Sequence, residues 1–295
     1  MQQQHVLAST EDASVNFATP FGTGFLEARY VRRDSEKVLA YLSSQSGCNQ
    51  ACRFCHLTRT RQTSFDHAGI DDLLAQLDSI LEHYSRVGET ALRLNINFMA
   101  RGEPLLNPNL MKDFDHFAKH ATIRAENAGI TTLKFNISTI MPRQASDVDL
   151  VKVFGSWPVN ICWSLYTTAS DFRRRWLPKA DDPETTAARL RRWQDVSGRD
   201  IVIHHALIAG ENDRDSDLSS ITDLMERHGL RAKLNLVRYN PADIGTGAEA
   251  SEDRYRLVKE KLMPSMKASG TRIVPRVGFD VKASCGMFLS AGDIL

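Results

Sequence analysis

The sequence lacks any long hydrophobic run, and its start lacks the pattern of an export signal. No stretch of the 295 residues approaches the ~20 apolar residues that a membrane-spanning helix needs. Residues 1–24 have neither the basic beginning nor the apolar centre of a signal peptide. We therefore expect a cytoplasmic, monomeric protein with no membrane partner.

Cysteine is scarce, and neither sign of charge dominates. The chain has five cysteines, too few for a disulfide framework, and three of them fall within residues 48–55, which points to metal or redox chemistry in a reducing compartment. The 37 basic and 36 acidic residues give a net charge of +1. No overall field would attract a polyanion, so a nucleic-acid partner would have to be held by local basic patches.

Short β-rich runs alternate with longer amphipathic stretches after residue 24. Six strand–helix units in succession predict an α/β domain over residues 25–295 with parallel strands, either an open doubly wound sheet or a barrel. Residues 1–24 are weakly patterned, and we expect an N-terminal extension or loop there. No G-x-G-x-x-G motif follows the first strand, which argues against dinucleotide binding. The expected strands are 38–45, 92–99, 132–138, 159–166, 201–207, 232–239 and a short one within 271–280; the expected helices are 70–88, 110–129, 183–198, 216–229 and 252–270.

Three clustered cysteines, Cys48, Cys52 and Cys55, directly follow the first expected strand with the spacing C-x3-C-x2-C. Zinc ribbons and fingers use a second, distant pair of ligands, which this chain does not offer. Three thiolates suit a 4Fe–4S cluster with one open iron, and an open metal position is typical of a catalytic site. The alternative is a structural zinc site completed by His56, although His56 is poorly placed because it adjoins Cys55.

With Phe54 before the last cysteine, the motif resembles that of the radical S-adenosylmethionine (SAM) superfamily, in which SAM chelates the open iron and is cleaved to a 5′-deoxyadenosyl radical. The chain further resembles the class A, dual-specificity methyltransferases that act on position 2 or 8 of a ribosomal RNA adenine. This resemblance implies a partial (βα)6 radical SAM barrel with a short N-terminal extension, a 4Fe–4S cluster, SAM, and a reductant such as flavodoxin or ferredoxin. It rests on "SSQSGCNQACRFC" (43–55), "RGEPLLNPNL" (101–110), "IST" (137–139), "SLYTTASDFRRRWLPK" (164–179), "LNLVRYNP" (234–241) and "GFDVKASCGMF" (278–288).

The resemblance also implies which residues contact SAM. Gly102 and Glu103 of "GEP" would cradle its amino group, which a carboxylate and backbone carbonyls can do. Taken alone, "GEP" is equally a turn after a strand. Tyr166 stands where the family usually has a histidine. The other implied SAM contacts lie at or near the ends of expected strands: Ser138, Ser164, Leu165 and Asn240.

Cys285 lies in a loop near the end of the chain. Most lone cysteines are small buried apolar residues, but the resemblance implies that Cys285 carries a methyl group. One SAM would methylate its sulfur, and the radical from a second SAM would take hydrogen from that methyl, whose carbon then adds to an sp2 carbon of a purine. Glu27 matches a family carboxylate expected to transfer protons; the alternative is an ordinary surface glutamate on a strand.

Tyr41 marks a departure from the family pattern. Seven residues before the first cluster cysteine, the family has a cysteine that resolves the protein–adenine adduct through a disulfide with the carrier. Either another thiol does this here, or the chemistry is not base methylation. Cys162 is a candidate, since it should face the same side of its strand as Ser164; plain core packing is the alternative.

The substrate remains open between RNA, DNA and a free nucleotide. Family members that act on ribosomal RNA carry a folded domain before the radical core, whereas 47 residues precede Cys48 here, so we expect that domain to be absent. The basic runs 59–61, 173–176 and 189–193 could grip phosphates or form solvated faces with Trp193 in the core. Three functions remain: methylation of a purine carbon through Cys285, other hydrogen-abstraction or adenosyl-addition chemistry, and a non-enzymatic iron–sulfur or zinc protein that binds nucleic acid.

Overall fold

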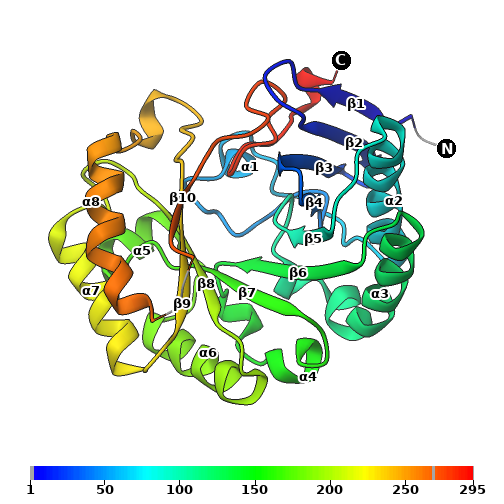
Figure 1. Ribbon diagram of the computed structural model, residues 1–295. Coiled ribbons are helices and arrows are strands. Elements are labelled where there is room, and N and C mark those ends of the chain that lie inside the picture. The colour runs from blue at the N-terminus through cyan, green and yellow to red at the C-terminus, as the bar shows by residue number, and fades with distance from the viewer. Residues whose placement is uncertain (1–2, 268–269, 295) are drawn as a thin grey trace.

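The chain folds around one ten-stranded sheet whose strands follow each other in sequence order from one edge to the other (Figure 1). The computed structural model describes residues 3–267 and 270–294. The first four strands pair antiparallel, and every pair from the fourth strand to the tenth is parallel. The strands are β1 (His5–Ala8), β2 (Val15–Phe21), β3 (Gly24–Asp34), β4 (Lys37–Leu42), β5 (Arg93–Phe98), β6 (Thr132–Thr139), β7 (Val159–Ser164), β8 (Ile201–Ala206), β9 (Ala232–Val237) and β10 (Arg272–Val274).

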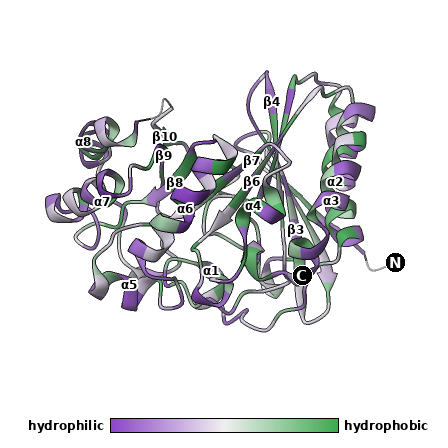
Figure 2. Ribbon diagram, turned by 90° about the horizontal axis from the view of Figure 1, so that it is seen from below, coloured by the Kyte–Doolittle hydropathy of each residue, from purple (hydrophilic) through white to green (hydrophobic). Residues whose placement is uncertain are grey.

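The longer helices lie along the outer face of this curved sheet, outside the ring of strands, whereas the short α1 lies within the outline of the ring (Figure 1). Figure 2 shows hydrophilic and hydrophobic segments alternating along α2 and α3, as expected of helices with one face on a sheet and the other in water. Helix α2 ends at Gly88, whose φ of 69° is the left-handed conformation that favours glycine. The helices are α1 (His56–Arg59), α2 (Ile70–Val87), α3 (Pro108–Asn127), α4 (Leu150–Phe154), α5 (Ser170–Trp176), α6 (Pro183–Ser197), α7 (Asp215–Arg227) and α8 (Glu252–Leu262).

The six expected parallel strands and four of the expected helices are confirmed, and β10 is the short final strand. The expected helix 252–270 is confirmed only to Leu262, where α8 ends; a 3-10 turn follows at Met263–Met266, and residues 268–269 lie outside the described residues. Over residues 3–24 the expected loop is wrong: this N-terminal extension contains β1 and β2, which add to the sheet beyond β3. Val15 and Phe17 of β2 are buried in the core, while Asn16 between them is buried among polar groups. Strands this short, with polar residues on their second face, leave only a weak pattern in the sequence.

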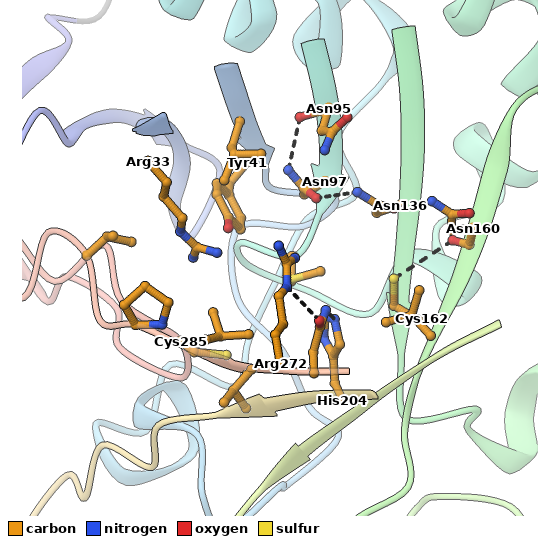
Figure 3. Close-up of a pocket in the computed structure, with 18 of the residues that line it drawn as sticks. Arg33, Tyr41, Asn95, Asn97, Asn136, Asn160, Cys162, His204, Arg272 and Cys285 are labelled. Atoms are coloured by element: carbon orange, nitrogen blue, oxygen red, sulfur yellow. Dashed lines mark hydrogen bonds between the residues drawn. The ribbon is translucent and has the colours of Figure 1, made fainter. Parts of the chain in front are cut away.

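Alternation along the parallel strands separates an apolar face from a polar one. On β5, Leu94, Ile96 and Phe98 are buried against the helices, whereas Asn95 and Asn97 line a cavity on the other face (Figure 3). The same division recurs on β6 and β7. The hydrophobic core therefore lies between sheet and helices, and the space inside the ring of strands is polar.

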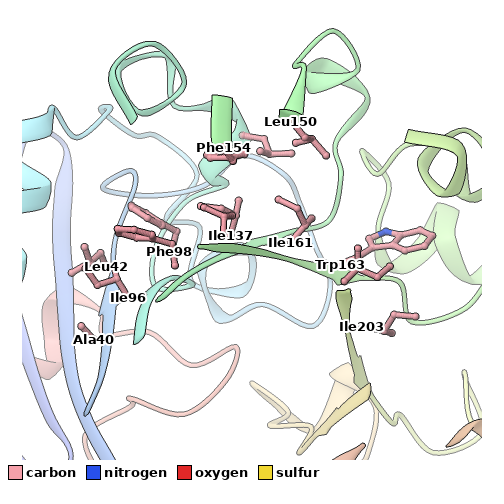
Figure 4. Close-up of a cluster of buried hydrophobic side chains, with 14 of the residues drawn as sticks. Ala40, Leu42, Ile96, Phe98, Ile137, Leu150, Phe154, Ile161, Trp163 and Ile203 are labelled. Carbon is pink, nitrogen blue, oxygen red and sulfur yellow. The ribbon is translucent and has the colours of Figure 1, made fainter. Parts of the chain in front are cut away.

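Figure 4 shows part of the core between the sheet and the helices, where Phe98 of β5 and Phe154 of α4 lie among aliphatic side chains such as Ile137. Phe114 of α3 is 1% exposed, and its ring lies edge-on to Phe154, with 4.7 Å between the ring centroids. Phe98 of β5 and Phe135 of β6 surround the same ring. Edge-to-face contacts of this kind add to the free energy gained from burial.

After β10 the chain returns across the molecule to its first strands (Figure 1). The hydroxyl of Ser9 and the backbone N–H of Thr10 donate to the carboxylate of Asp280, at 2.6 and 2.8 Å. The N–H of Gly278 donates to Asp12 at 2.8 Å. The last residues thus link the two edges of the sheet. Within the described residues, no helix combines the length and the apolarity needed to cross a bilayer.

We predict that Phe114→Ala lowers the free energy of unfolding by about 3–5 kcal/mol, because it removes the ring at the centre of the aromatic cluster and leaves a cavity. Urea denaturation followed by circular dichroism measures the change. Ile123→Ala on the same helix is the control, since Ile123 is 50% exposed and should change the value by less than about 0.5 kcal/mol. Equal effects of the two substitutions would contradict this description of the core.

Candidate active site

The three clustered cysteines lie in the loop that follows β4, at the carboxyl end of the parallel strands. Cys52 is buried, and Cys48 and Cys55 are partly exposed. Burial raises the pKa of Cys48 to about 12, and the neighbouring Cys55 adds to the rise. Burial likewise raises the pKa of Cys52, with contributions from both other thiols. The three sulfurs therefore share one low-polarity pocket, and a metal centre there would have to displace their protons.

His56 does not face this group as a fourth ligand. Its Nε2 lies 3.2 Å from the backbone oxygen of Asn240, and burial lowers the pKa of the ring. In the parts of the chain that the structure describes, no three His, Cys, Asp or Glu side chains are placed to share one metal ion. Thiolates around a single zinc ion lie roughly 4 Å apart. The zinc site with His56 is therefore not formed by the described residues, and the three thiols stay the predicted ligands of a 4Fe–4S cluster.

The "GEP" segment approaches the cysteine loop so closely that only glycine fits at its first position. Gly102 has φ of +96°, and a Cβ there would lie 2.6 Å from Ser44 Oγ and 2.8 Å from Gln45 Oε1. That same Gln45 oxygen accepts the N–H of Glu103 at 2.9 Å. The turn is therefore fixed against the residues that precede Cys48.

Glu103 is a buried carboxylate that lacks a cation. It accepts hydrogen bonds from the N–H groups of Leu105 and Ile140, at 3.2 and 3.1 Å. Burial raises its pKa to about 7, and no ion pair found among the described residues includes it. An ammonium group from a ligand would supply the missing positive charge, so this observation fits the expected amino group of SAM.

The other residues expected to contact SAM also lie near the carboxyl ends of strands. Ser138 is the second-last residue of β6, and Ser164 is the last residue of β7; both are partly buried. The side chain of Leu165 packs in the main core, so only its backbone faces the site. Tyr166 has a left-handed φ of 63° and stacks on Phe54, with 4.6 Å between the ring centroids. Burial raises the pKa of Tyr166, as do the nearby thiols of Cys285, Cys52 and Cys55, so its ring lies between the cysteine loop and Cys285.

Asn240 holds the loop that carries Cys285. Its Nδ2 donates to the backbone oxygen of Cys285 at 2.9 Å, and its Oδ1 accepts from Arg276 Nε at 2.6 Å. From the other side, the N–H of His56 donates to the oxygen of Gly286 at 2.9 Å. The Cys285 loop is thus hydrogen-bonded directly to the cysteine loop. The sequence alone did not reveal this use of Asn240.

Glu27 on β3 is completely buried, and both of its carboxylate oxygens are occupied. Oε1 accepts from Arg101 Nε at 2.7 Å and from the N–H of Leu289 at 3.0 Å. Oε2 accepts from Arg29 Nη2 at 2.8 Å and from Asn16 Nδ2 at 3.0 Å. Burial by itself would raise the pKa of Glu27, but the guanidinium groups of Arg29 and Arg101 outweigh it and hold the pKa below its ordinary value. The alternative of an ordinary surface glutamate is therefore wrong, and proton transfer stays a prediction.

The cations around Glu27 extend the network to the Cys285 segment. Arg29 donates to the backbone oxygens of Met287 at 2.7 Å and Ala283 at 3.3 Å. Asn16 donates to the oxygen of Val281 at 3.1 Å. Residues 281–289 are therefore held by hydrogen bonds to their backbone, whatever their side chains are.

Cys285 opens onto a cavity of about 520 Å³ inside the ring of strands (Figure 3). Although protein surrounds it, its side chain is exposed to this space. Cys162 and Tyr41 line the same cavity, which confirms that Cys162 faces the interior. The residues expected to contact SAM do not line it; they lie beyond it at the strand ends.

A row of asparagines crosses the cavity wall and was not predicted. Asn97, Asn136 and Asn160 stand in register on β5, β6 and β7. Asn160 donates to Asn136 at 2.8 Å, and Asn136 donates to Asn97 at 2.7 Å. Tyr41 on β4 is in register with Asn97, at the end of this row. The asparagines at alternate positions of β5, β6 and β7 were the signal in the sequence that could have revealed it.

The basic runs noted in the sequence are largely structural. Trp193 is fully buried, and Arg191 and Arg192 pair with Asp195 and Asp149, which confirms the solvated-face interpretation for residues 189–193. Arg173 is buried and donates to backbone oxygens, including that of Leu165 at 3.0 Å. Arg173 is therefore committed to the fold, whereas Arg191 and Arg192 stay on a solvated surface.

Comparison with known proteins gives a family and several relatives. Residues 42–220 match the radical SAM superfamily. The dual-specificity RNA methyltransferase RlmN of Acidiphilium cryptum is 30% identical over 263 residues, which cover 84% of this chain and 62% of that protein. RlmN of Rhodospirillum rubrum is 29% identical, over 90% of this chain and 60% of its own length. This chain therefore spans about three fifths of the length of these two relatives.

A solved structure supports the same fold. The crystal structure of a radical SAM methyltransferase from Sphaerobacter thermophilus aligns with a TM-score of 0.76, covering 97% of this chain and 81% of the other at 20% identity. HydG, a maturase of the [FeFe]-hydrogenase, aligns with a TM-score of 0.55 at 14% identity, covering 81% of this chain and 52% of HydG. The parallel strands with outer helices therefore form the partial barrel that the sequence predicted.

We predict that Glu27→Gln lowers the free energy of unfolding by about 3 kcal/mol or more, because it leaves the buried guanidinium groups of Arg29 and Arg101 without a counter-charge. Urea denaturation measures the loss, and hydrogen exchange should show that residues 281–289 lose protection first. Glu184→Gln is the control: Glu184 is exposed, and its pairs with Arg227 and His228 lie at the surface. Unchanged protection of residues 281–289 would contradict the anchoring role.

The same carboxylate makes stability sensitive to acid. Because the folded-state pKa of Glu27 lies below the ordinary value of 4.5, its stabilisation is fully present above that value and is lost as pH falls through the lower folded-state pKa. We expect the difference in unfolding free energy between wild type and Glu27→Gln to be constant from about pH 7 to pH 5 and to shrink below about pH 4. Urea titrations at each pH measure this difference, and a constant gap down to acid pH would contradict an ionised Glu27.

Proposed function

Because the chain belongs to the radical SAM superfamily, we propose that it methylates an sp2 carbon of a purine and that Cys285 is the methyl carrier. One observation carries this proposal: the Cys285 loop is hydrogen-bonded to the cysteine loop through His56 N–H and Gly286 O, at 2.9 Å, while the thiol itself opens onto the cavity. A carrier has to reach both the cofactors and the substrate. Cys285 stands at the boundary between the two.

The described residues fit the cofactors of the family. Cys48, Cys52 and Cys55 would hold a 4Fe–4S cluster, and Glu103 would hold the ammonium group of SAM. When bound, cluster and SAM supply an electrophilic methyl group and, after one-electron reduction, a carbon radical that abstracts hydrogen. The electron would come from a protein such as flavodoxin or ferredoxin. Gly102, Ser138, Ser164, Leu165 and Tyr166 remain the proposed neighbours of SAM.

Cys285 must lose its proton before it can accept a methyl group. Burial raises the pKa of its thiol, whereas the guanidinium groups of Arg29 and Arg33 act in the opposite direction. The thiolate then forms a carbon–sulfur bond as the methyl–sulfonium bond breaks, and a neutral thioether leaves. Glu27 contributes by holding the loop in place through Leu289 and Arg29.

We further propose that Cys162 replaces the resolving cysteine that is missing at Tyr41. Its thiolate would attack the sulfur of Cys285, forming a disulfide and releasing the methylated purine, which takes up one proton; a two-electron reductant then restores both thiols. Cys162 lines the same cavity as Cys285. Burial raises the pKa of Cys162 to about 12, so the thiol is reactive only once it is deprotonated.

A second candidate function keeps the radical chemistry and drops the carrier. Hydrogen abstraction from a different substrate, or adenosyl addition to it, would need no resolving thiol. The tyrosine at position 41 favours this alternative, because its phenol faces the cavity and cannot form a disulfide.

We predict that wild-type protein incubated with SAM and reductant gains about 14 Da on Cys285, detected by peptide mass spectrometry. Cys285→Ser should show no gain there and no purine methylation, while SAM is still cleaved. Cys162→Ser should accumulate modified Cys285 with little product release. Cys55→Ala is the control for the cluster and should abolish SAM cleavage. Cleavage of SAM by wild type without any mass gain on Cys285 would favour the second candidate.

A further inference from the structure

The charged side chains that line the cavity inside the ring of strands are all positive. None of the described residues that line it is acidic. The inward-facing positions of β4, β5, β6, β9 and β10 each contribute one cation, and others come from β3 and from the residue after β9. The cationic lining residues are Arg29, Arg33, Lys37, Arg93, Lys134, Lys233, Arg238 and Arg272.

Most of these cations have no carboxylate partner. Arg29 pairs with Glu27, Lys37 with Asp34 and Arg238 with Glu252, all through acids outside the cavity. The ion pairs found among the described residues include none of the other five: Arg33, Arg93, Lys134, Lys233 and Arg272. The chain as a whole has nearly as many acidic as basic residues, with a net charge of +1. The excess of positive charge in the cavity is therefore local.

Arg33 and Arg272 converge at the middle of the cavity. Figure 3 shows Arg33 reaching in from β3 and Arg272 from β10, between Tyr41 and Cys285. The Nε of Arg33 is buried without a hydrogen-bond partner, and Arg272 makes one side-chain contact, from Nε to Asn235 Oδ1 at 2.9 Å. Burial lowers the pKa of Arg272, and Arg33 lowers it further. Two guanidinium groups held this way leave their outer N–H groups free for an anion.

A second group of cations lies at the amino ends of the strands. Burial lowers the pKa of Lys134, and the nearby Arg93 and Lys233 lower it further. Asn95 beside them has a buried Oδ1 without a partner. Like charges held together in this way are unfavourable unless an anion lies among them.

The size of the cavity limits what the anion can be. A volume of about 520 Å³ lies in the range of roughly 300–1,000 Å³ that small-molecule sites occupy. The wall is a continuous sheet from β4 to β10, so the cations face inward and are not spread along an outer groove. The cavity is open to solvent where Arg93, Lys233 and Arg272 are exposed. A polynucleotide needs a longer basic track than this volume offers, whereas one or two phosphates fit among its arginines.

We propose that this cavity binds the phosphate of a free purine nucleotide, with Arg33 and Arg272 as its main ligands and the purine turned toward Cys285. The purine end rests on the proposed function, since it assumes that Cys285 delivers the methyl group. The proposed binding of the phosphate depends only on the cations of the cavity and not on the role of Cys285. The asparagines at positions 97, 136 and 160 add neutral hydrogen-bonding groups between the two ends.

Isothermal titration calorimetry of the anaerobically prepared, cluster-reconstituted full chain tests the site, with adenosine 5′-monophosphate and adenosine as probes. We expect the monophosphate to bind at least about tenfold more tightly than adenosine, because only it can form charge-assisted hydrogen bonds. Arg272→Gln and Arg33→Gln, which change the two main ligands, should each remove most of that difference. Arg256→Gln is the matched control, since Arg256 is exposed on α8 and pairs with Asp253. Thermal unfolding of each variant checks that it is folded.

Equal binding of adenosine and its monophosphate, or an unchanged ratio in folded Arg272→Gln, would overturn the proposal. So would a single-stranded oligoadenylate that binds more tightly than the monophosphate and is insensitive to Arg272→Gln, which would point to a polymer bound elsewhere. Calorimetry measures binding without catalytic turnover. The phosphate site and the carrier role of Cys285 can therefore be refuted independently of each other. Tight nucleotide binding without methylation of Cys285 would keep the anion site and refute the carrier, and a methylated Cys285 without nucleotide binding would do the reverse.

Discussion

A single buried carboxylate connects the beginning of this chain to its end. Glu27 lies between the guanidinium groups of Arg29 and Arg101 and also accepts the N–H of Leu289. Taking three charged groups out of water is expensive, and their attraction returns little net stability. The main effect of the arrangement is to fix the segment that carries Cys285 in one place, beside the cysteine loop.

The sheet has its apolar and polar faces arranged so that the ring of strands can hold a ligand. Leu94, Ile96 and Phe98 face the helices, so the stabilising core lies outside the ring. The inner face is then free of packing demands, and Asn97 or Lys134 can occupy positions that a filled barrel would give to valine or isoleucine. Stability and binding are therefore assigned to opposite faces of the same strands.

Much of this could be predicted from the sequence because it depends on local patterns. Alternation and helical periodicity gave the parallel strands and the outer helices, and the spacing of Cys48, Cys52 and Cys55 identified the cysteine loop. The contacts of Glu27 with Leu289 and of Asn240 with Cys285 could not be predicted, since they join residues 262 and 45 positions apart. The cations of the cavity were missed because each strand contributes only one, and a run of charge was the pattern sought. A lysine or arginine near the start of successive strands would have been the better signal.

The link between Asp280 and residues Ser9 and Thr10 joins the last part of the chain to the first. During synthesis, residues 281–289 emerge after every element that binds them, and contacts so distant in sequence form late in folding. Cys285 is therefore positioned only when the rest of the barrel already exists. In a partly made chain the cysteine loop can form before the segment that carries Cys285 is ordered beside it.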